Sequence, residues 1–235
     1  MNPLISVLLP TRKRVAMLEK SLTSLLDHSR HPDQIEIMIA YDDDDQESKD
    51  YFSGFAWSKF ISHWPVQHQI SCVPRWGYRE LHKYINMLAQ ASKGKWIFFW
   101  SDDPIMETKN WDDHVRANED FVGLLHIGAS NAPVDCSILP LFHRSWLDLF
   151  GCVSPVNHAD SWMSEICRRA EARIVIPVTI FHDRFENSGN NRDETWEDKR
   201  RDMENGSSSK DYYLPESKRL RLEWAEKLRN FRQNL

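Results

Sequence analysis

Two short apolar segments, separated by an amphipathic one, restrict what the N-terminal part of this chain can fold into. Residues 5–10 (ISVLLP) and 35–41 (IEIMIAY) are almost wholly apolar, as strands buried on both faces of a sheet are. Between them, leucines recur at helical spacing, which predicts a helix over residues 14–27. A strand, a helix and a second strand in this order form a parallel pair, so we expect an α/β protein.

Further segments extend this pattern through residue 185. We predict additional strands at residues 67–73, 96–100, 121–127, 137–142 and 173–182. We predict additional helices at residues 79–92, 144–150 and 160–172, with Gly94 as the C-cap residue of the first. Residues 1–185 are therefore expected to form a single α/β/α domain with a mostly parallel, mixed central sheet.

The composition changes after residue 185. Residues 186–213 are polar, carry charges of both signs and include a Gly-Ser run, so we predict a mobile segment. Residues 214–235 predict a C-terminal amphipathic helix with a basic outer face. Its apolar stripe consists of Leu220, Trp224, Leu228, Phe231 and Leu235. Such a helix either docks on the domain or makes peripheral contact with a membrane, and we favour docking.

Charge, hydropathy and cysteine usage narrow the class of protein. The formal net charge of −5 over 235 residues gives no general attraction to nucleic acid. No apolar run approaches the roughly 18 residues of a membrane span, and the N-terminus indicates a first strand rather than a signal peptide. The cysteines contain no C-x-x-C pair and predict neither a zinc site nor a disulfide framework. We expect a reduced, cytoplasmic protein with no nucleic-acid partner and no transmembrane segment.

Two of the predicted strands end in carboxylates. Residues 42–45 are four aspartates, and Asp102 and Asp103 follow the strand at 96–100. Ligands bind at the carboxyl ends of strands in an open α/β sheet, so we expect the two clusters to converge there. Two unit charges about 4 Å apart repel by roughly 4 kcal/mol at an effective dielectric near 20, a cost that a bound cation would remove. The alternative is that Asp-Asp-Pro simply initiates a surface turn.

The sequence lacks the usual phosphate-binding loops. Neither G-x-x-x-x-G-K-[ST] nor G-x-G-x-x-G occurs, and none of the eight glycines falls in the turn after the first strand. A metal ion that holds a diphosphate is the remaining way to bind a nucleotide at this edge. Oxygen ligands suit Mg²⁺ and Mn²⁺, and an imidazole such as His182 suits Mn²⁺ better. The basic turn at residues 12–14 is either solvated or contacts phosphate.

The ordered motifs over residues 4–182 resemble the family 2 glycosyltransferases, which have the GT-A fold. The resemblance rests on ISVLLPTRKR, IEIMIAYDDDD, GKWIFFWSDD, PLFHRSWLDLFG, NHADSWMSEICRRAEARIVIPV and IFH. GKWIFFWSDD is similar to the strand that carries the metal-binding DxD motif of that family, and IFH to the strand whose final His faces the metal. The resemblance implies an inverting, metal-dependent transfer of a sugar from a UDP-, GDP- or dTDP-sugar to the hydroxyl of a saccharide or another acceptor.

The resemblance also implies residues for the nucleotide. Pro10, Thr11 and Arg12 would lie beneath the nucleoside, and Asp42 would accept the ring N–H of the base. We expect the aspartates at residues 43–45 to be solvated, since one carboxylate is enough to hold one N–H. Asp102 would lie beside the ribose. Either Arg75 or Arg79 would contact the base or the phosphates, and we favour Arg75.

For the chemistry, the resemblance implies Asp103 as a ligand of Mn²⁺ or Mg²⁺, with His182 as a further ligand, and Asp160 as the general base. The alternative for Asp160 is a helix cap. Ala159 stands where the family often has Glu, which is a departure from the pattern. The stretch between Asp103 and Asp160 is short for the family, and implies a reduced acceptor side. Three tryptophans could provide a sugar platform there: Trp111, Trp146 and Trp162.

Three other functions remain open at the level of sequence. A nucleotidyltransferase on a similar fold would be expected to have a Gly-rich first loop, which this chain lacks. A non-catalytic nucleotide-sugar or carbohydrate-binding domain would bind without turnover. A metal-dependent phosphoesterase would hydrolyse simple phosphate esters without an acceptor.

Overall fold

A computed structural model describes residues 3–132, 135, 137–190, 192–204 and 210–235. In this part of the chain eight strands form one sheet, in the order β3-β2-β1-β4-β7-β6-β8-β5. The strands β1 to β4 are parallel, and β7 and β5 are the antiparallel members. The strands are β1 Ile5–Thr11, β2 Ile35–Asp42, β3 Gln67–Val73, β4 Trp96–Phe99, β5 Pro104–Met106, β6 Leu124–Ala129, β7 Leu141–His143 and β8 Arg173–His182.

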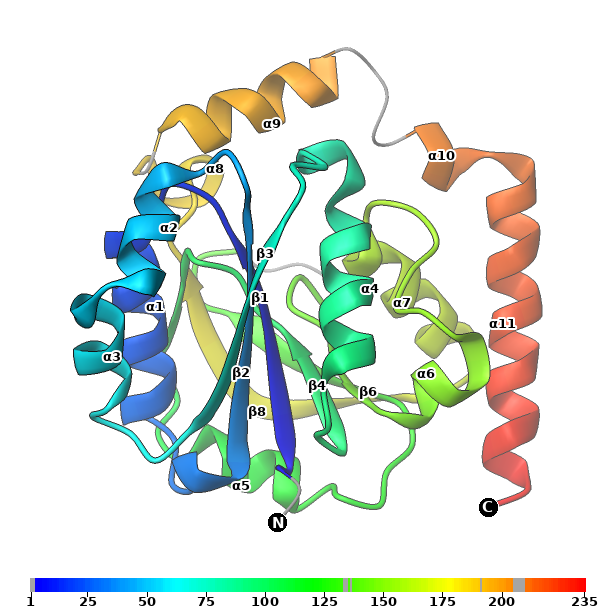
Figure 1. Cartoon of the computed structure of the whole chain (residues 1–235). Helices are drawn as coiled ribbons and strands as arrows, with labels where there is room; N and C mark the ends of the chain where they lie inside the picture. Colours follow the sequence, from blue (N-terminus) through cyan, green and yellow to red (C-terminus); the bar gives the residue numbers. More distant parts are fainter. Residues whose placement is uncertain (1–2, 133–134, 136, 191, 205–209) are drawn as a thin grey trace.

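Helices cover both faces of the sheet (Figure 1). The α-helices are α1 Val15–Asp27, α2 Gln46–Ser53, α3 Phe55–Ile61, α4 Leu81–Ala91, α5 Trp111–Arg116, α6 Ser145–Phe150, α7 Ala159–Arg169, α8 Phe185–Ser188, α9 Glu194–Glu204, α10 Lys210–Tyr213 and α11 Pro215–Gln233. Two short 3-10 helices are η1 Pro32–Gln34 and η2 Tyr78–Glu80. In Figure 1, α1, α2 and α3 lie on one side of the sheet, and α4, α6, α7 and α11 lie on the other.

The central strands are apolar on both sides because each side carries its own core. Along β1, Val7 and Leu9 belong to the core beneath α1, whereas Leu8 belongs to the core beneath α4. Side chains alternate between the faces of a strand, so a strand covered on both sides must be apolar throughout. This confirms the predicted fold class, a mostly parallel mixed sheet between two helical layers with a C-terminal helix.

Two details of the sequence prediction are wrong. The strand expected at residues 137–142 is reduced to β7, because Pro140 has no N–H to donate to a neighbouring strand and pairing begins at Leu141. Gly94 does not cap a helix, since α4 ends at its C-cap residue Ser92. Instead, a Cβ at Gly94 would lie 2.6 Å from the backbone nitrogen of Ser6, so glycine allows close packing on β1. Helices α2, α3 and α5 and strand β5 were not predicted.

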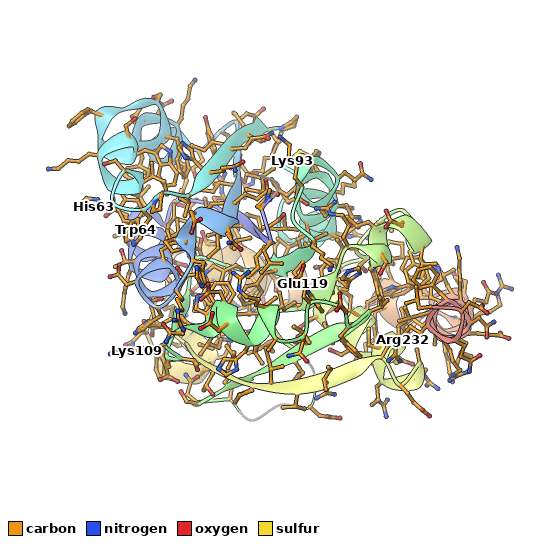
Figure 2. The ribbon with its side chains drawn as sticks, turned by 90° about the horizontal axis from the view of Figure 1, so that it is seen from below. His63, Trp64, Lys93, Lys109, Glu119 and Arg232 are labelled. Atoms are coloured by element: carbon orange, nitrogen blue, oxygen red, sulfur yellow. The ribbon has the colours of Figure 1, made fainter. Side chains whose placement is uncertain are left out.

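The segment at residues 186–213 contains regular structure where none was predicted. Helix α9 crosses the end of the sheet at which β1 and β2 finish, as Figure 1 shows at the top. The mobility of this segment stays a prediction, and its Gly-Ser run lies outside the described residues. Figure 2 shows the opposite end, seen from below, with Lys93, Lys109 and Glu119.

The C-terminal helix α11 docks on α6 and α7. Trp224 stacks on Phe150 with ring centroids 4.3 Å apart, and Leu228 is buried. Arg221 is also buried and donates to Glu165 of α7 at 2.7 Å. Within the described residues, no helix is long and apolar enough to cross a membrane.

The cysteines that the structure describes are free thiols. Cys72 is exposed, Cys152 is partly buried and Cys167 is buried, and Cys136 lies outside the described residues. Burial raises the pKa of Cys167 to about 12, so this thiol stays protonated.

Candidate functional site

A cavity of about 710 Å³ opens at the carboxyl ends of β1, β2 and β4, between the sheet and α9. Strand β1 ends at Thr11, β2 at Asp42 and β4 just before the two aspartates, so the topology brings these motifs to one edge. The cavity is lined by every site residue expected from the sequence: Pro10, Thr11, Arg12, Asp42, Arg75, Asp102, Asp103, Asp160 and His182.

Asp102 is buried between two donors at the floor of the cavity. Thr11 donates to Asp102 Oδ2 at 2.9 Å, and Arg14 donates to Oδ1 at 3.1 Å. Burial raises the pKa of Asp102 to about 6, although the charge of Arg14 acts to lower it. Arg14, in the basic turn, is therefore not solvated but pairs with this carboxylate.

Asp103 lies close to His182 where strand β5 pairs with strand β8. Strand β5 begins directly after Asp103 and runs antiparallel to β8, with Pro104 opposite His182. This register places Asp103 Oδ1 3.4 Å from His182 Nε2, and Ser101 donates to the same oxygen at 2.6 Å. Burial acts to raise the pKa of Asp103, but the contacts with His182 and Ser101 outweigh it and hold the pKa below its ordinary value.

Asp103 and His182 together could supply two protein ligands to a divalent cation. Among the described residues, no group of three or more His, Cys, Asp or Glu side chains is arranged to hold a metal. Mg²⁺ sites in phosphate-transfer enzymes commonly have one or two carboxylates, with water and substrate phosphate completing the shell. The Nδ1 atom of His182 is buried and has no hydrogen-bond partner within the described part of the chain. Of the two cations, Mn²⁺ suits an imidazole ligand better than Mg²⁺ does.

Asp42 is buried and held from two sides. Tyr84 donates its phenolic hydrogen to Asp42 Oδ1, and Arg12 donates to Oδ2 at 3.0 Å. Burial raises the pKa of Asp42, while Tyr84 and Arg12 act to lower it. The Tyr84 oxygen also accepts the backbone N–H groups of Trp76 and Gly77, at 2.8 and 3.1 Å. Tyr84 therefore joins Asp42 to the loop that carries the next predicted residue, Arg75.

The acidic side of α9 pairs with the rim of the cavity. Asp198 accepts from Arg75 at 2.7 Å, and Asp193, just before the helix, accepts from Arg14 at 2.7 and 2.8 Å. Arg79, the alternative to Arg75, also lines the cavity. These contacts hold α9 over the carboxyl ends of the strands.

Asp160 lies in the first turn of α7 and is partly accessible from the cavity. The N-cap position belongs to His158, whose backbone φ is 69°, in the left-handed region. Asp160 Oδ1 accepts the N–H of the adjacent Ser161 at 2.7 Å. The alternative that Asp160 is the cap residue of this helix is therefore wrong.

Two expectations about side chains near the site are also wrong. The tryptophans considered as a sugar platform, Trp111, Trp146 and Trp162, are buried in the two cores and do not line the cavity. Asp45, one of the aspartates expected to be solvated, is buried and caps α2 by accepting from Ser48 N at 3.1 Å.

Three further cavity residues were missed from the sequence: Tyr84, Arg184 and Lys199. Arg184 follows His182 by two residues, and a cation beside a predicted metal ligand was a usable signal. Tyr84 lies in a predicted helix with no motif around it. Lys199 lies in the segment predicted to be mobile, so the sequence offered no reason to place it at the site.

Comparison with known proteins identifies the fold. No family model matches this chain, and no curated protein matches its sequence. Solved structures do match. A mannosyltransferase from Pyrobaculum calidifontis, PcManGT in complex with GDP-Man and Mn²⁺, aligns with a TM-score of 0.58 and 15% identity, over 78% of this chain and 57% of that one.

A second similar structure is TarS 1-349 of S. aureus in complex with UDP-GlcNAc, with a TM-score of 0.59 and 13% identity. The alignment covers 83% of this chain and 61% of TarS 1-349. The chain has the fold of these proteins. It spans about three fifths of the length of each of the two structures.

Proposed function

We propose that this protein is a metal-dependent glycosyltransferase that moves a sugar from a nucleoside-diphosphate sugar to an acceptor hydroxyl, with inversion. One observation carries the proposal: residues predicted from separate motifs line a single cavity at the carboxyl ends of the strands. The similarity to structures that hold GDP-Man with Mn²⁺, or UDP-GlcNAc, supports the same donor class.

The residues divide the proposed site into a nucleoside end and a reacting end. Pro10, Thr11 and Arg12 lie beneath the nucleoside, and Asp42 accepts a ring N–H of the base. A buried carboxylate suits this task, because its oxygens accept but do not donate when ionised. Arg75 contacts the base or the phosphates from the rim. Uracil, thymine and guanine all present a ring N–H, so UDP-, dTDP- and GDP-sugars are the candidate donors.

Asp102 lies beside the ribose, between the two ends. At the reacting end, Asp103 and His182 would hold Mn²⁺ or Mg²⁺. The bound cation would neutralise charge on the diphosphate leaving group. The Asp160 carboxylate accepts the proton of the acceptor hydroxyl as that oxygen bonds to the anomeric carbon. The bond from the anomeric carbon to the diphosphate oxygen breaks, and its electron pair leaves with the nucleoside diphosphate.

A panel of nucleotide sugars, scored by thermal shift with and without Mn²⁺, tests the donor assignment. We expect nucleotide sugars of one base to raise the melting temperature of the protein in the presence of the metal. The Asp103→Ala variant should lose the metal-dependent part of that rise. If no nucleotide sugar shifts the wild-type protein, the proposed function is wrong.

Turnover of the donor so identified then tests the role of Asp160. We expect Asp160→Asn to retain donor binding but to lose about 10²- to 10⁴-fold in rate, the usual contribution of a general base. Asp148→Asn, an exposed carboxylate on α6, is the matched control and should keep the wild-type rate. Donor binding without turnover, unchanged by Asp160→Asn, would instead indicate a non-catalytic binding domain.

A further inference from the structure

Lys199 of α9 is only partly exposed, although the two arginines that follow it in the helix are exposed. Its side chain is 13% exposed, whereas that of the neighbouring Arg200 is 43% exposed. Lysine is rarely buried unless it is paired, because removing its charge from water is costly. Lys199 lines the cavity, and its Nζ lies 5.9 Å from the ring centroid of Tyr78 in η2. Lys199 therefore places a cation at the border of the candidate site.

A second cation, Arg184, shares a carboxylate with Lys199. Glu186 accepts from Arg184 Nε at 2.9 Å through one oxygen and from Lys199 Nζ through the other. All three side chains line the cavity. One carboxylate thus lies between two cations, so the three side chains together carry a net positive charge. They form a charged wall of the cavity.

This charged wall lies beside the proposed metal ligands. Arg184 follows His182 by two residues, and the charge of Asp103 acts on both Arg184 and Lys199. The position of Lys199 is set by the rest of its segment, since the Thr195 hydroxyl donates to Arg12 O at 3.0 Å. The two cations therefore line the same cavity as the proposed metal ligands Asp103 and His182.

We propose that Lys199 and Arg184 bind the diphosphate of the donor, and that Glu186 occupies these cations when no donor is bound. This inference rests on the proposed function, which supplies the diphosphate. Charge-assisted hydrogen bonds to phosphate oxygens are stronger than neutral ones. Cations fixed at this position also stabilise the negative charge that develops on the leaving diphosphate. In this proposal helix α9 not only covers the cavity but also binds the donor.

Binding of a nucleoside diphosphate and of the matching monophosphate tests this, measured by calorimetry with Mn²⁺ for UDP and UMP, GDP and GMP, and dTDP and dTMP. We expect Lys199→Ala to weaken diphosphate binding by about 10- to 100-fold, the loss of one hydrogen bond to a charged group. Monophosphate binding should change less than about twofold, because the second phosphate is what the lysine contacts. Lys199→Arg should restore most of the loss.

Two variants separate this role from a purely structural one. Arg200→Ala removes a neighbouring cation that bonds to Glu197 and Glu204, and should bind the diphosphate as the wild type does. Glu186→Gln removes the competing carboxylate and should tighten diphosphate binding. Equal losses for mono- and diphosphate in Lys199→Ala, or weaker diphosphate binding in Glu186→Gln, would overturn the inference.

Inorganic pyrophosphate with Mn²⁺ distinguishes a failure here from a failure of the proposed function. If the wild type binds pyrophosphate through Lys199 but binds no nucleoside diphosphate, the nucleotide assignment is wrong and the anion site stands. If the wild type binds a nucleoside diphosphate and Lys199→Ala binds it equally well, the inference is wrong and the proposed function stands. If neither ligand binds the wild type, both are wrong.

Discussion

Removing the hydroxyl of Tyr84 tests the link between protein stability and the base-binding end of the cavity. The Tyr84→Phe variant leaves the ring in place, where it is 5% exposed, and deletes one oxygen. That oxygen donates to Asp42 and accepts the backbone N–H groups of Trp76 and Gly77, at 2.8 and 3.1 Å. One substitution thus removes three hydrogen bonds without changing the packing of the ring.

The expected loss of stability follows from those bonds. A neutral hydrogen bond contributes about 0.5–1.5 kcal/mol and one to a charged group about 1.5–3 kcal/mol, so the three together contribute about 2.5–6 kcal/mol. The groups lie at the wall of an open cavity, where water can replace part of the lost bonding. We therefore expect a loss of about 2 kcal/mol, slightly below this range. Without the hydroxyl, Asp42 and the loop at residues 75–77 are no longer held in position relative to each other, so nucleotide binding should weaken.

Urea unfolding followed by circular dichroism measures the stability, and hydrogen exchange at Trp76 and Gly77 reports the loop. Tyr213→Phe, which removes the same atom from a residue that is 75% exposed, is the matched control and should change the free energy of unfolding by less than about 0.5 kcal/mol. A Tyr84→Phe protein with wild-type stability and unchanged exchange at both amides would refute the reasoning.

Three further predictions concern the scaffold. Arg221→Ala removes a buried side chain that donates to the partly buried Glu165, so it should lower the free energy of unfolding by about 1.5–3 kcal/mol, whereas Arg219→Ala, exposed on the same helix, should change it little. Equal effects of the two variants in thermal unfolding would count against the docking of α11. Burial acts to raise the pKa of Glu165, but its hydrogen bonds and the charge of Arg221 hold this pKa below the ordinary value of 4.5, so the stability that Glu165 contributes is present above pH 4.5 and is lost as the pH falls. The loss of unfolding free energy in Glu165→Gln relative to wild type should therefore become smaller in acid, and a loss independent of pH would contradict this. Gly94→Ala should lower the free energy of unfolding by about 1–3 kcal/mol because the new Cβ would overlap β1, while Gly128→Ala, whose Cβ would lie 3.8 Å from its nearest atoms, should lower it clearly less. Similar denaturation midpoints for the two variants would contradict the close packing of Gly94.

The sequence predicted the buried central strands because a strand that is buried on both faces must be apolar along its whole length. Residues 5–10 and 35–41 lie in parallel strands of the structure, and the helix expected at 14–27 is α1. Several short elements escaped prediction, because a few residues carry too little periodic pattern. Strand β5 is three residues long, and its position depends on pairing with the end of β8, a contact between residues far apart in the chain.

The sequence by itself determined that Asp42, Asp102 and Asp103 would meet, because parallel strands deliver their carboxyl ends to one edge. Tertiary structure alone decided which other groups join them. Tyr84 reaches Asp42 from a helix face, and Lys199 enters the cavity from a segment that no local pattern connects to the sheet. The physical reason is that local sequence fixes the direction of a strand, whereas the partners of a buried charge are set by contacts between distant segments.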